Sequence, residues 1–298
     1  GNRRMVVAAS LLAVTALALA GCGTPAGVDG DLTNNWPAMA EAKVPVPAAG
    51  VCYDTAYDTT ASAPFNTVDC AKTHHTETTY VGQFTGADAS RSTPPLSGSA
   101  GRRTAFEACM KNTSDYIGGD YHAAMVFLGL VLPDGNAWKG GARWFRCDVT
   151  QYADPDDDNE VTTGSVKDGL TGDAKLAFPC MNVVEQGSQY IGDNTPPVPC
   201  TGSHSAEFVG LYTAPDKAWN DDATARSNQA RDACWDKLYS YVGSSNPSRL
   251  IGLIWENFNQ DDWELGDRTI RCWAYDEGPT HKFGESVKGI GTRDPKQG

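Results

Sequence analysis

The sequence is short of positive charge and of long apolar segments. Among its 298 residues, 24 Lys and Arg stand against 37 Asp and Glu, which gives a formal net charge of -13. An acidic chain of this kind disfavours both nucleic acid and anionic lipid headgroups as partners. After residue 22, no segment has the roughly 20 apolar residues that a membrane-spanning helix needs. We therefore expect no nucleic-acid partner and no transmembrane helix in the body of the chain.

The sequence also lacks the signatures of common envelope enzymes. It contains no Gly-x-Ser-x-Gly nucleophile elbow, no Ser-x-x-Lys of the penicillin-binding type, no phosphate-binding glycine loop and no zinc-protease helix with paired histidines. We expect a protein that is not an enzyme and that needs no metal ion or cofactor.

The first 22 residues have the pattern of a bacterial export signal. Arg3 and Arg4 precede an apolar run from Met5 to Ala20. The run ends in Leu-Ala-Gly-Cys, which looks like a lipobox, so we expect Cys22 to become the lipidated N-terminus. An ordinary secretory signal is the alternative. Residues 23–44 carry Gly, Pro, Asn, Asp and Ala without apolar periodicity, which predicts a flexible tether.

Most of the remaining sequence is a repeated pattern. Cys109, Tyr116, Gly118, Trp138, Gly141, Arg143, Arg146 and Cys147 recur without a gap as Cys234, Tyr241, Gly243, Trp263, Gly266, Arg268, Arg271 and Cys272. Upstream, Cys70, His74 and Glu77 recur as Cys200, His204 and Glu207. Such a repeat indicates a duplicated module. We place the first module at residues 45–170, the second at 171–291 and a tail at 292–298.

The cysteine count agrees with an exported protein. Apart from Cys22 there are eight, which are Cys52, Cys70, Cys109 and Cys147 in the first module and Cys180, Cys200, Cys234 and Cys272 in the second. An even set in an oxidising compartment predicts disulfides. The equal spacing favours Cys109–Cys147 and Cys234–Cys272, with the remaining cysteines of each module paired. Each set of four still allows three pairings, and a thiolate metal site is a further alternative.

Apolar spacing predicts one main helix per module, over residues 105–116 and 230–241. Gly118 and Gly243 stand where a C-terminal cap belongs, and Asp221 or Asp222 is a plausible N-cap. Strands are expected near Cys52 and Cys70 and over 76–84, 123–132 and 143–149, and their counterparts near Cys180 and Cys200 and over 206–212, 250–255 and 268–275. The order is β-β-β-α-β-β, twice. This is an α+β fold with one helix on a small, mostly antiparallel sheet in each of two disulfide-stapled modules.

Two repeated groups resemble functional sites. His74 with Glu77, and His204 with Glu207, could bind a metal ion or act as a general base pair. Residues three apart on a strand point to opposite faces, which favours a structural role. Trp138 with Arg143, and Trp263 with Arg268, could stack on a sugar, although a buried anchor is favoured. The acidic run at 154–160 does not fit a calcium loop and is interpreted as a solvated linker.

The ordered set Cys, Cys-x3-His-x2-Glu, helical Cys and Trp-x2-Gly-x-Arg-x2-Arg-Cys resembles the septum-formation domain of actinobacterial envelope proteins. The resemblance covers residues 51–167 and 179–288, including the closing Ser-Val-Lys at 165–167 and 286–288. It implies an exported, membrane-attached, non-enzymatic domain associated with the division septum.

We therefore expect a lipid-anchored binding or scaffold protein at the outer face of the cytoplasmic membrane of a Gram-positive cell. Its expected partners are that membrane, through the lipid, and divisome or cell-wall components. Two alternatives remain open. One is a cell-wall carbohydrate binder that uses Trp138 and Trp263, and the other is an envelope hydrolase that uses the repeated His and Glu residues.

Overall fold

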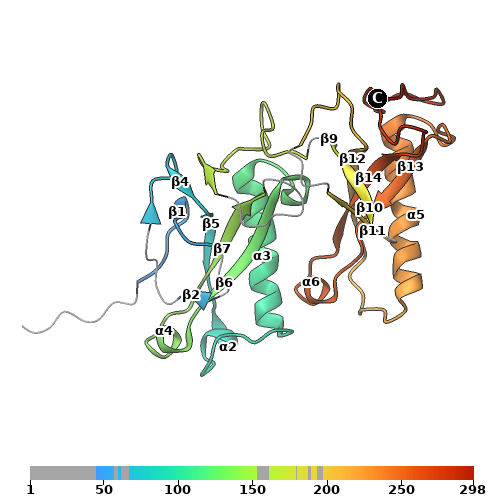
Figure 1. Ribbon diagram of the computed structural model, residues 1–298. Helices are drawn as coiled ribbons and strands as arrows, with labels where there is room; N and C mark the ends of the chain where they lie inside the picture. Colours follow the sequence, from blue (N-terminus) through green and yellow to red (C-terminus); the bar gives the residue numbers. More distant parts are fainter. Residues whose placement is uncertain are drawn as a thin grey trace, which may run out of the picture. The chain divides into compact units, whose positions relative to one another are not determined.

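A computed structural model describes residues 45–56, 60–61, 67–152, 161–178, 180–186, 189–192 and 197–298 (Figure 1). The expected signal segment and tether, and the acidic run at 154–160, lie outside the described residues. From Val44 to Gly298 the chain groups into one compact unit. No helix of the described part is both long enough and apolar enough to cross a membrane.

The first module is built on a six-stranded sheet with the strand order β2-β6-β7-β5-β1-β3. Its strands are β1 (Val51–Tyr53), β2 (Thr60–Ala61), β3 (Thr67–Val68), β5 (Thr76–Gln83), β6 (Val126–Pro133) and β7 (Trp144–Gln151). All neighbours are antiparallel except β2, which runs parallel to the end of β6. The continuous apolar run of β6 is buried along nearly its whole length, as expected for a strand covered on both faces. Separately, β4 (Thr73–His74) pairs with β8 (Thr162–Thr163).

The second module repeats this plan with fewer strands. Its sheet has the order β13-β14-β12-β9, formed by β9 (Cys180–Met181), β12 (Ala206–Thr213), β13 (Ile251–Trp255) and β14 (Thr269–Asp276). A separate hairpin joins β10 (Val183–Gln186) to β11 (Gln189–Gly192). The register of β5 shifts between Thr78 and Tyr80, and that of β12 shifts at the equivalent place, between Phe208 and Gly210. The duplication therefore preserves even this local irregularity.

One long helix packs against each sheet, as the apolar spacing predicts (Figure 1). These are α3 (Ala100–Ile117) and α5 (Ala223–Val242), and their buried faces centre on the cysteines. Asp222 caps α5 by accepting a hydrogen bond from the amide of Ala225, which settles the choice of N-cap. Gly118 and Gly243 end the helices in the left-handed conformation, with φ values of 83° and 79°.

The described residues also include four short helices that the sequence patterns did not predict. They are α2 (Gly86–Ala89), η2 (Tyr121–Ala123), α4 (Gly135–Lys139) and α6 (Gln260–Glu264). Asp134 caps α4 and Asn259 caps α6, each accepting hydrogen bonds from two backbone amides. These caps fix the turns that carry Trp138 and Trp263.

The α+β prediction is confirmed, with local differences. The expected strand at Cys200 is absent from the described residues, where Val198 forms only an isolated bridge with Cys180. The first hydrophobic core continues past the expected boundary at 170, since Leu176 is part of it. At the other end, residues 292–298 return to the second module, where Gly298 donates to the carbonyl of Lys282 at 2.8 Å.

Four disulfides join the cysteines in the pairs that the repeat favours. They are Cys52–Cys70, Cys109–Cys147, Cys180–Cys200 and Cys234–Cys272. In each module one disulfide ties the main helix to the last strand of the sheet. The first two cysteines of each module lie near Glu77 or Glu207. Because their sulfurs are bonded to each other, these groups offer no thiolate to a metal ion.

Candidate functional site

The repeated glutamates are buried and bind the chain's own polar groups. Glu77 accepts hydrogen bonds from Tyr116 Oη and Ser165 Oγ, both at 2.6 Å, and from the amide of Val166 at 2.8 Å. Burial, followed by the bond to Glu77, raises the pKa of Tyr116 to about 12. The carboxylate therefore fastens the helix and the closing Ser-Val-Lys segment to β5.

The second copy repeats this arrangement, which we call the glutamate clasp: Glu77 with Tyr116, Ser165 and Val166, and Glu207 with Tyr241, Ser286 and Val287. Glu207 accepts from Tyr241 Oη at 2.5 Å, from the Val287 amide at 2.8 Å and from Ser286 Oγ. Burial raises the pKa of Glu207, but hydrogen bonds from His204, Ser286 and Tyr241 outweigh it and leave the pKa below its usual value. In this copy the clasp therefore favours the ionised form of Glu207.

The histidines of the repeated motif are also buried. The Nδ1 atoms of His74 and His204 lie 2.8 and 2.7 Å from the carbonyls of Lys72 and Gly202. His204 Nε2 lies 3.5 Å from Glu207, so the expectation that the pair would face opposite ways is wrong. The regular strand begins only at Ala206, so strand alternation does not extend back to the histidine. The two histidines and two glutamates are each no more than 1% exposed, so we assign them a structural role.

The two tryptophans are buried anchors beneath short helices. Trp138 is 1% exposed and Trp263 is 8% exposed. Each indole donates its Nε1 hydrogen at 2.8 Å to a backbone carbonyl, that of Arg91 for Trp138 and that of Lys217 for Trp263. The expected cation–π contact is present, with the guanidinium carbon of Arg143 4.2 Å from the Trp138 ring centroid. Neither indole presents a free face, so stacking of a sugar on these two residues is not supported.

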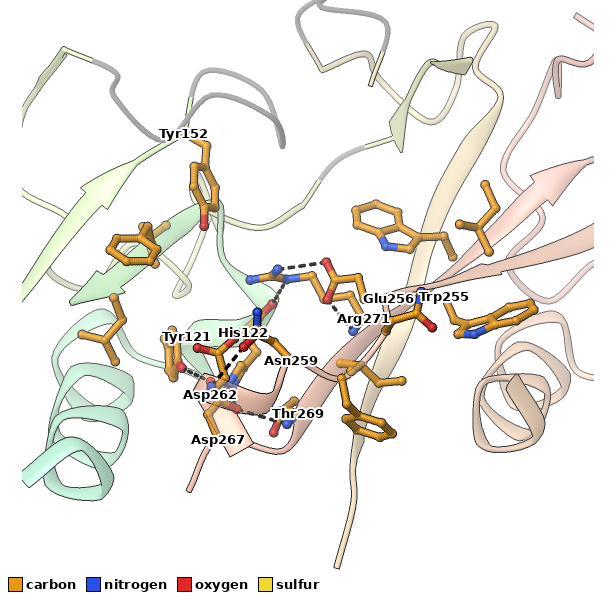
Figure 2. Close-up of a pocket in the computed structure, with 18 of the residues that line it drawn as sticks. Tyr121, His122, Tyr152, Trp255, Glu256, Asn259, Asp262, Asp267, Thr269 and Arg271 are labelled. Carbon is orange, nitrogen blue, oxygen red and sulfur yellow. Dashed lines mark hydrogen bonds and ion pairs between the residues drawn. The ribbon is translucent and has the colours of Figure 1, made fainter. Parts of the chain in front are cut away.

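A cleft of about 700 Å³ lies where residues of the first module meet the second (Figure 2). It is lined by η2 and β6 on one side and by β13, α6 and β14 on the other. Its lining includes aromatic, amide and charged side chains: Tyr121, His122, Phe127, Tyr152, Trp255, Glu256, Asn257, Asn259, Asp262, Asp267 and Arg271. A concave, largely preformed site of this size, with a few convergent polar groups, is typical of ligand-binding pockets.

At the floor of the cleft, His122 bridges two carboxylates. Its Nδ1 lies 2.7 Å from Asp120, and its Nε2 lies 2.9 Å from Asp267 of the second module. Both nitrogens must donate to satisfy these contacts, which favours the imidazolium form. Burial lowers the pKa of His122, but the two carboxylates outweigh it and raise the pKa. Asp267 also accepts from Tyr121 Oη at 2.7 Å.

Arg271 adds a second link across the floor. Its Nε donates to the carbonyl of His122 at 2.7 Å, and its Nη1 lies 3.0 Å from Glu256. The guanidinium also lies over the ring of Phe178, 4.8 Å from the centroid. His122 and Arg271 therefore hold the two modules in contact at the cleft (Figure 2).

Asp262 has a different position in the cleft. Its accessible carboxylate lines the opening, and within the described residues no Lys or Arg forms an ion pair with it. Partial burial, followed by the charges of Asp267 and Asp261, raises the pKa of Asp262. A cationic group placed here would therefore be stabilised.

The repeat and the apolar spacing of the sequence do not predict this cleft, because most of its residues are not part of the repeat. At the positions equivalent to His122, Asp267 and Asp262, the other copy has Pro247, Ala142 and Ala137. The signal that could have found the cleft is the set of charged residues that appear in one copy only. Residues that both copies share are mostly used in disulfides, clasps and cores.

Comparison with known proteins gives one match. A family model described as "Septum formation" matches residues 49–272, a single span that runs through both modules. Searches of curated proteins and of solved structures found no match.

Proposed function

Because the chain belongs to the septum-formation family, we propose that it is a lipid-anchored, non-enzymatic binding or scaffold protein at the outer face of the cytoplasmic membrane. On this proposal Cys22 carries the lipid, residues 23–44 form the tether, and the modules present the cleft to divisome or cell-wall components. The host is an actinobacterial cell. A role related to septum formation follows from the family, and the remaining details are the proposal.

The observation that carries this proposal is the way in which the two copies have diverged. Shared residues build the scaffold, whereas His122, Glu256, Asp262 and Asp267 appear in one copy only and meet in the cleft. In a protein whose two halves otherwise repeat each other, a cleft whose charged residues are mostly unshared is the surface best suited to a specific partner.

The local chemistry supports binding rather than catalysis. Both ring nitrogens of His122 are engaged by carboxylates, so neither is free to take a proton from a substrate. The repeated histidines and glutamates lie in the cores of the modules. No observation favours the envelope-hydrolase alternative.

The test is localisation of a fluorescent fusion in growing cells. The proposal expects enrichment at division sites and fatty-acid labelling that is lost in Cys22→Ser. A fusion distributed evenly through the division cycle would contradict the septal role. Unlabelled wild-type protein would contradict the lipid anchor while leaving the septal role open to the localisation result.

Cell-wall carbohydrate binding is a second candidate, now placed in the cleft rather than at Trp138 and Trp263. The half-buried Trp255 lines the cleft among amide and carboxylate side chains, a combination that suits sugars. Retention on insoluble peptidoglycan should then fall in Trp255→Ala and persist in Trp235→Ala, which changes a half-buried indole on α5 outside the cleft. Equal retention of both variants would remove this candidate.

A further inference from the structure

The strand β6 and its counterpart β13 each have an outer edge, and this edge differs between the two modules. In the first module, β2 pairs with the end of β6, with Thr60 opposite Leu132 and Ala61 opposite Pro133. In the second module, β13 pairs only with β14 within the described residues. In the second module, the segment that follows the first cysteine at about the same sequence distance as β2 does in the first module is β11. This strand pairs with β10 instead. Among the described residues, the same edge is therefore paired with a further strand in one module and not in the other.

The gapless repeat locates the open edge. Leu132 and Pro133 correspond to Asn257 and Phe258, which follow the end of β13 along the chain. Trp255 is opposite Cys272 just as Leu130 is opposite Cys147, so the registers of the two strands agree. The residues that β2 covers in the first module therefore correspond to Asn257 and Phe258, which directly follow Trp255 and Glu256, and all four of these residues line the cleft.

Within the described part of the chain, the backbone of residues 255–258 has hydrogen-bonding groups that no other strand uses. Glu256 donates its amide to the carbonyl of Arg271, the residue directly opposite it. In an antiparallel pair such bonded residues alternate with residues whose N–H and C=O groups face outward. Leu253, Trp255 and Asn257 therefore face away from β14, and Asn257 is exposed and makes no backbone hydrogen bond within the described residues.

The charge beside this edge indicates what would bind there. Asp267 is engaged by His122 and Glu256 by Arg271, whereas the accessible carboxylate of Asp262 forms no ion pair within the described part of the chain, although the charge of His122 attracts it from within the cleft. An unpaired carboxylate beside an open edge is complementary to a basic side chain carried on an added strand. Addition of a strand to a sheet edge is a common mode of peptide recognition.

We propose that the edge from Trp255 to Phe258 binds an extended peptide segment of a partner protein, parallel to β13, with a Lys or Arg of that segment on Asp262. This inference names the partner chemistry of the cleft and rests on the proposed binding function. Main-chain hydrogen bonds supply affinity, and the basic residue supplies selectivity.

The test selects random twelve-residue linear peptides, displayed on phage, against the full exported chain with its disulfides intact. Selected peptides are then made synthetically and their affinities measured by fluorescence anisotropy. We expect enrichment of peptides with Lys or Arg, and affinity that falls about tenfold or more in Asp262→Asn, which corresponds to about 1.4 kcal/mol. Asp261→Asn is the matched control, because Asp261 is on the same turn of α6 but does not line the cleft. It should bind normally.

Two further measurements address the edge itself. Asn257→Pro removes an outward-facing N–H and should abolish binding. Because that variant could also disturb the fold, hydrogen exchange of the wild-type complex provides an independent readout. The amides of Trp255 and Asn257 should exchange more slowly when peptide is bound, whereas that of Glu256, already bonded to β14, should change little.

The proposal is overturned if no peptide is enriched, if selected peptides bind Asp262→Asn as tightly as wild type, or if the exchange of Trp255 and Asn257 is unchanged. Retention on insoluble peptidoglycan that depends on Trp255, without peptide binding, would assign the cleft to a glycan and also overturn it. None of these results bears on localisation at the septum, so failure of this inference is distinguishable from failure of the proposed function.

Discussion

A single buried glutamate fastens three segments of each module. Its oxygens hold a tyrosine of the main helix, a serine of the closing segment and a backbone amide. A hydrogen bond to a charged acceptor contributes about 1.5–3 kcal/mol, and a buried acceptor left without its donor is costly. The residues that most resemble a catalytic pair in the sequence are thus structural.

Tyr241→Phe tests the clasp. It removes one donor to Glu207 while keeping the ring, so we expect the free energy of unfolding to fall by about 1.5–3 kcal/mol in urea denaturation. Tyr239→Phe on the same helix is the control. Within the described residues its hydroxyl makes no hydrogen bond, and its stacking on Trp235 is retained. Equal stabilities of the two variants would rule out a stabilising clasp.

His122 should make stability depend on pH. Its raised pKa means that its contribution is fully present below the unfolded value of about 6.5 and is lost as pH rises through the folded pKa. Asp267 has a lowered pKa, so its contribution is present above about pH 4 and is lost as pH falls through the folded pKa. The contact is therefore strongest between these limits.

Wild type should exceed His122→Gln in unfolding free energy by on the order of 1 kcal/mol near pH 5.5, the scale of a partly exposed ion pair. The difference should shrink at alkaline pH. The charged and titratable groups around His122 are Asp120, Tyr121, Asp262, Asp267 and Arg271. His281→Asn, at an exposed residue with a φ of 52°, is the control. A difference in unfolding free energy between wild type and His122→Gln that stays constant from pH 5 to pH 9 would contradict this account.

At the scale of elements, the two main helices were predictable because their signals are local. Apolar residues recur at helical spacing, Asp222 caps one start, and Gly118 and Gly243 end the helices. The short helices α4 and α6 have no such periodicity. They form because Asp134 or Asn259 caps a turn whose tryptophan is held in a core built by distant strands.

The two terminal glycines should respond differently to substitution. A Cβ on Gly118 would lie 2.4 Å from Thr171 Cγ2, whereas the nearest atom to a Cβ on Gly243 is 3.9 Å away. We expect Gly243→Ala to cost about 1 kcal/mol for the left-handed conformation alone. Gly118→Ala should cost more, because Thr171 must also move. Thermal unfolding of both variants checks the order, and a larger loss in Gly243→Ala would contradict it.

At the scale of the whole molecule, each disulfide lies within one module, so loss of one should act locally. Replacing Cys109 and Cys147 by Ser should destabilise the first module by about 3–4 kcal/mol on a loop-entropy model. Hydrogen exchange should then increase within residues 45–170. The matched double variant at Cys234 and Cys272 should show the reverse distribution. Equal increases in both modules would mean that the contacts at the cleft make them one cooperative unit.

The duplication, the fold class, the disulfide count and the main helices could all be predicted from the sequence. These depend on spacing along the chain and on the repeat, both of which can be read without coordinates. The approach of His204 to Glu207 could be seen only in the tertiary structure, because the regular strand begins after this histidine. The tertiary structure alone brought His122 to Asp267, residues far apart in the sequence that belong to different modules. The cleft depends on such contacts between the copies, which leave no periodic signal.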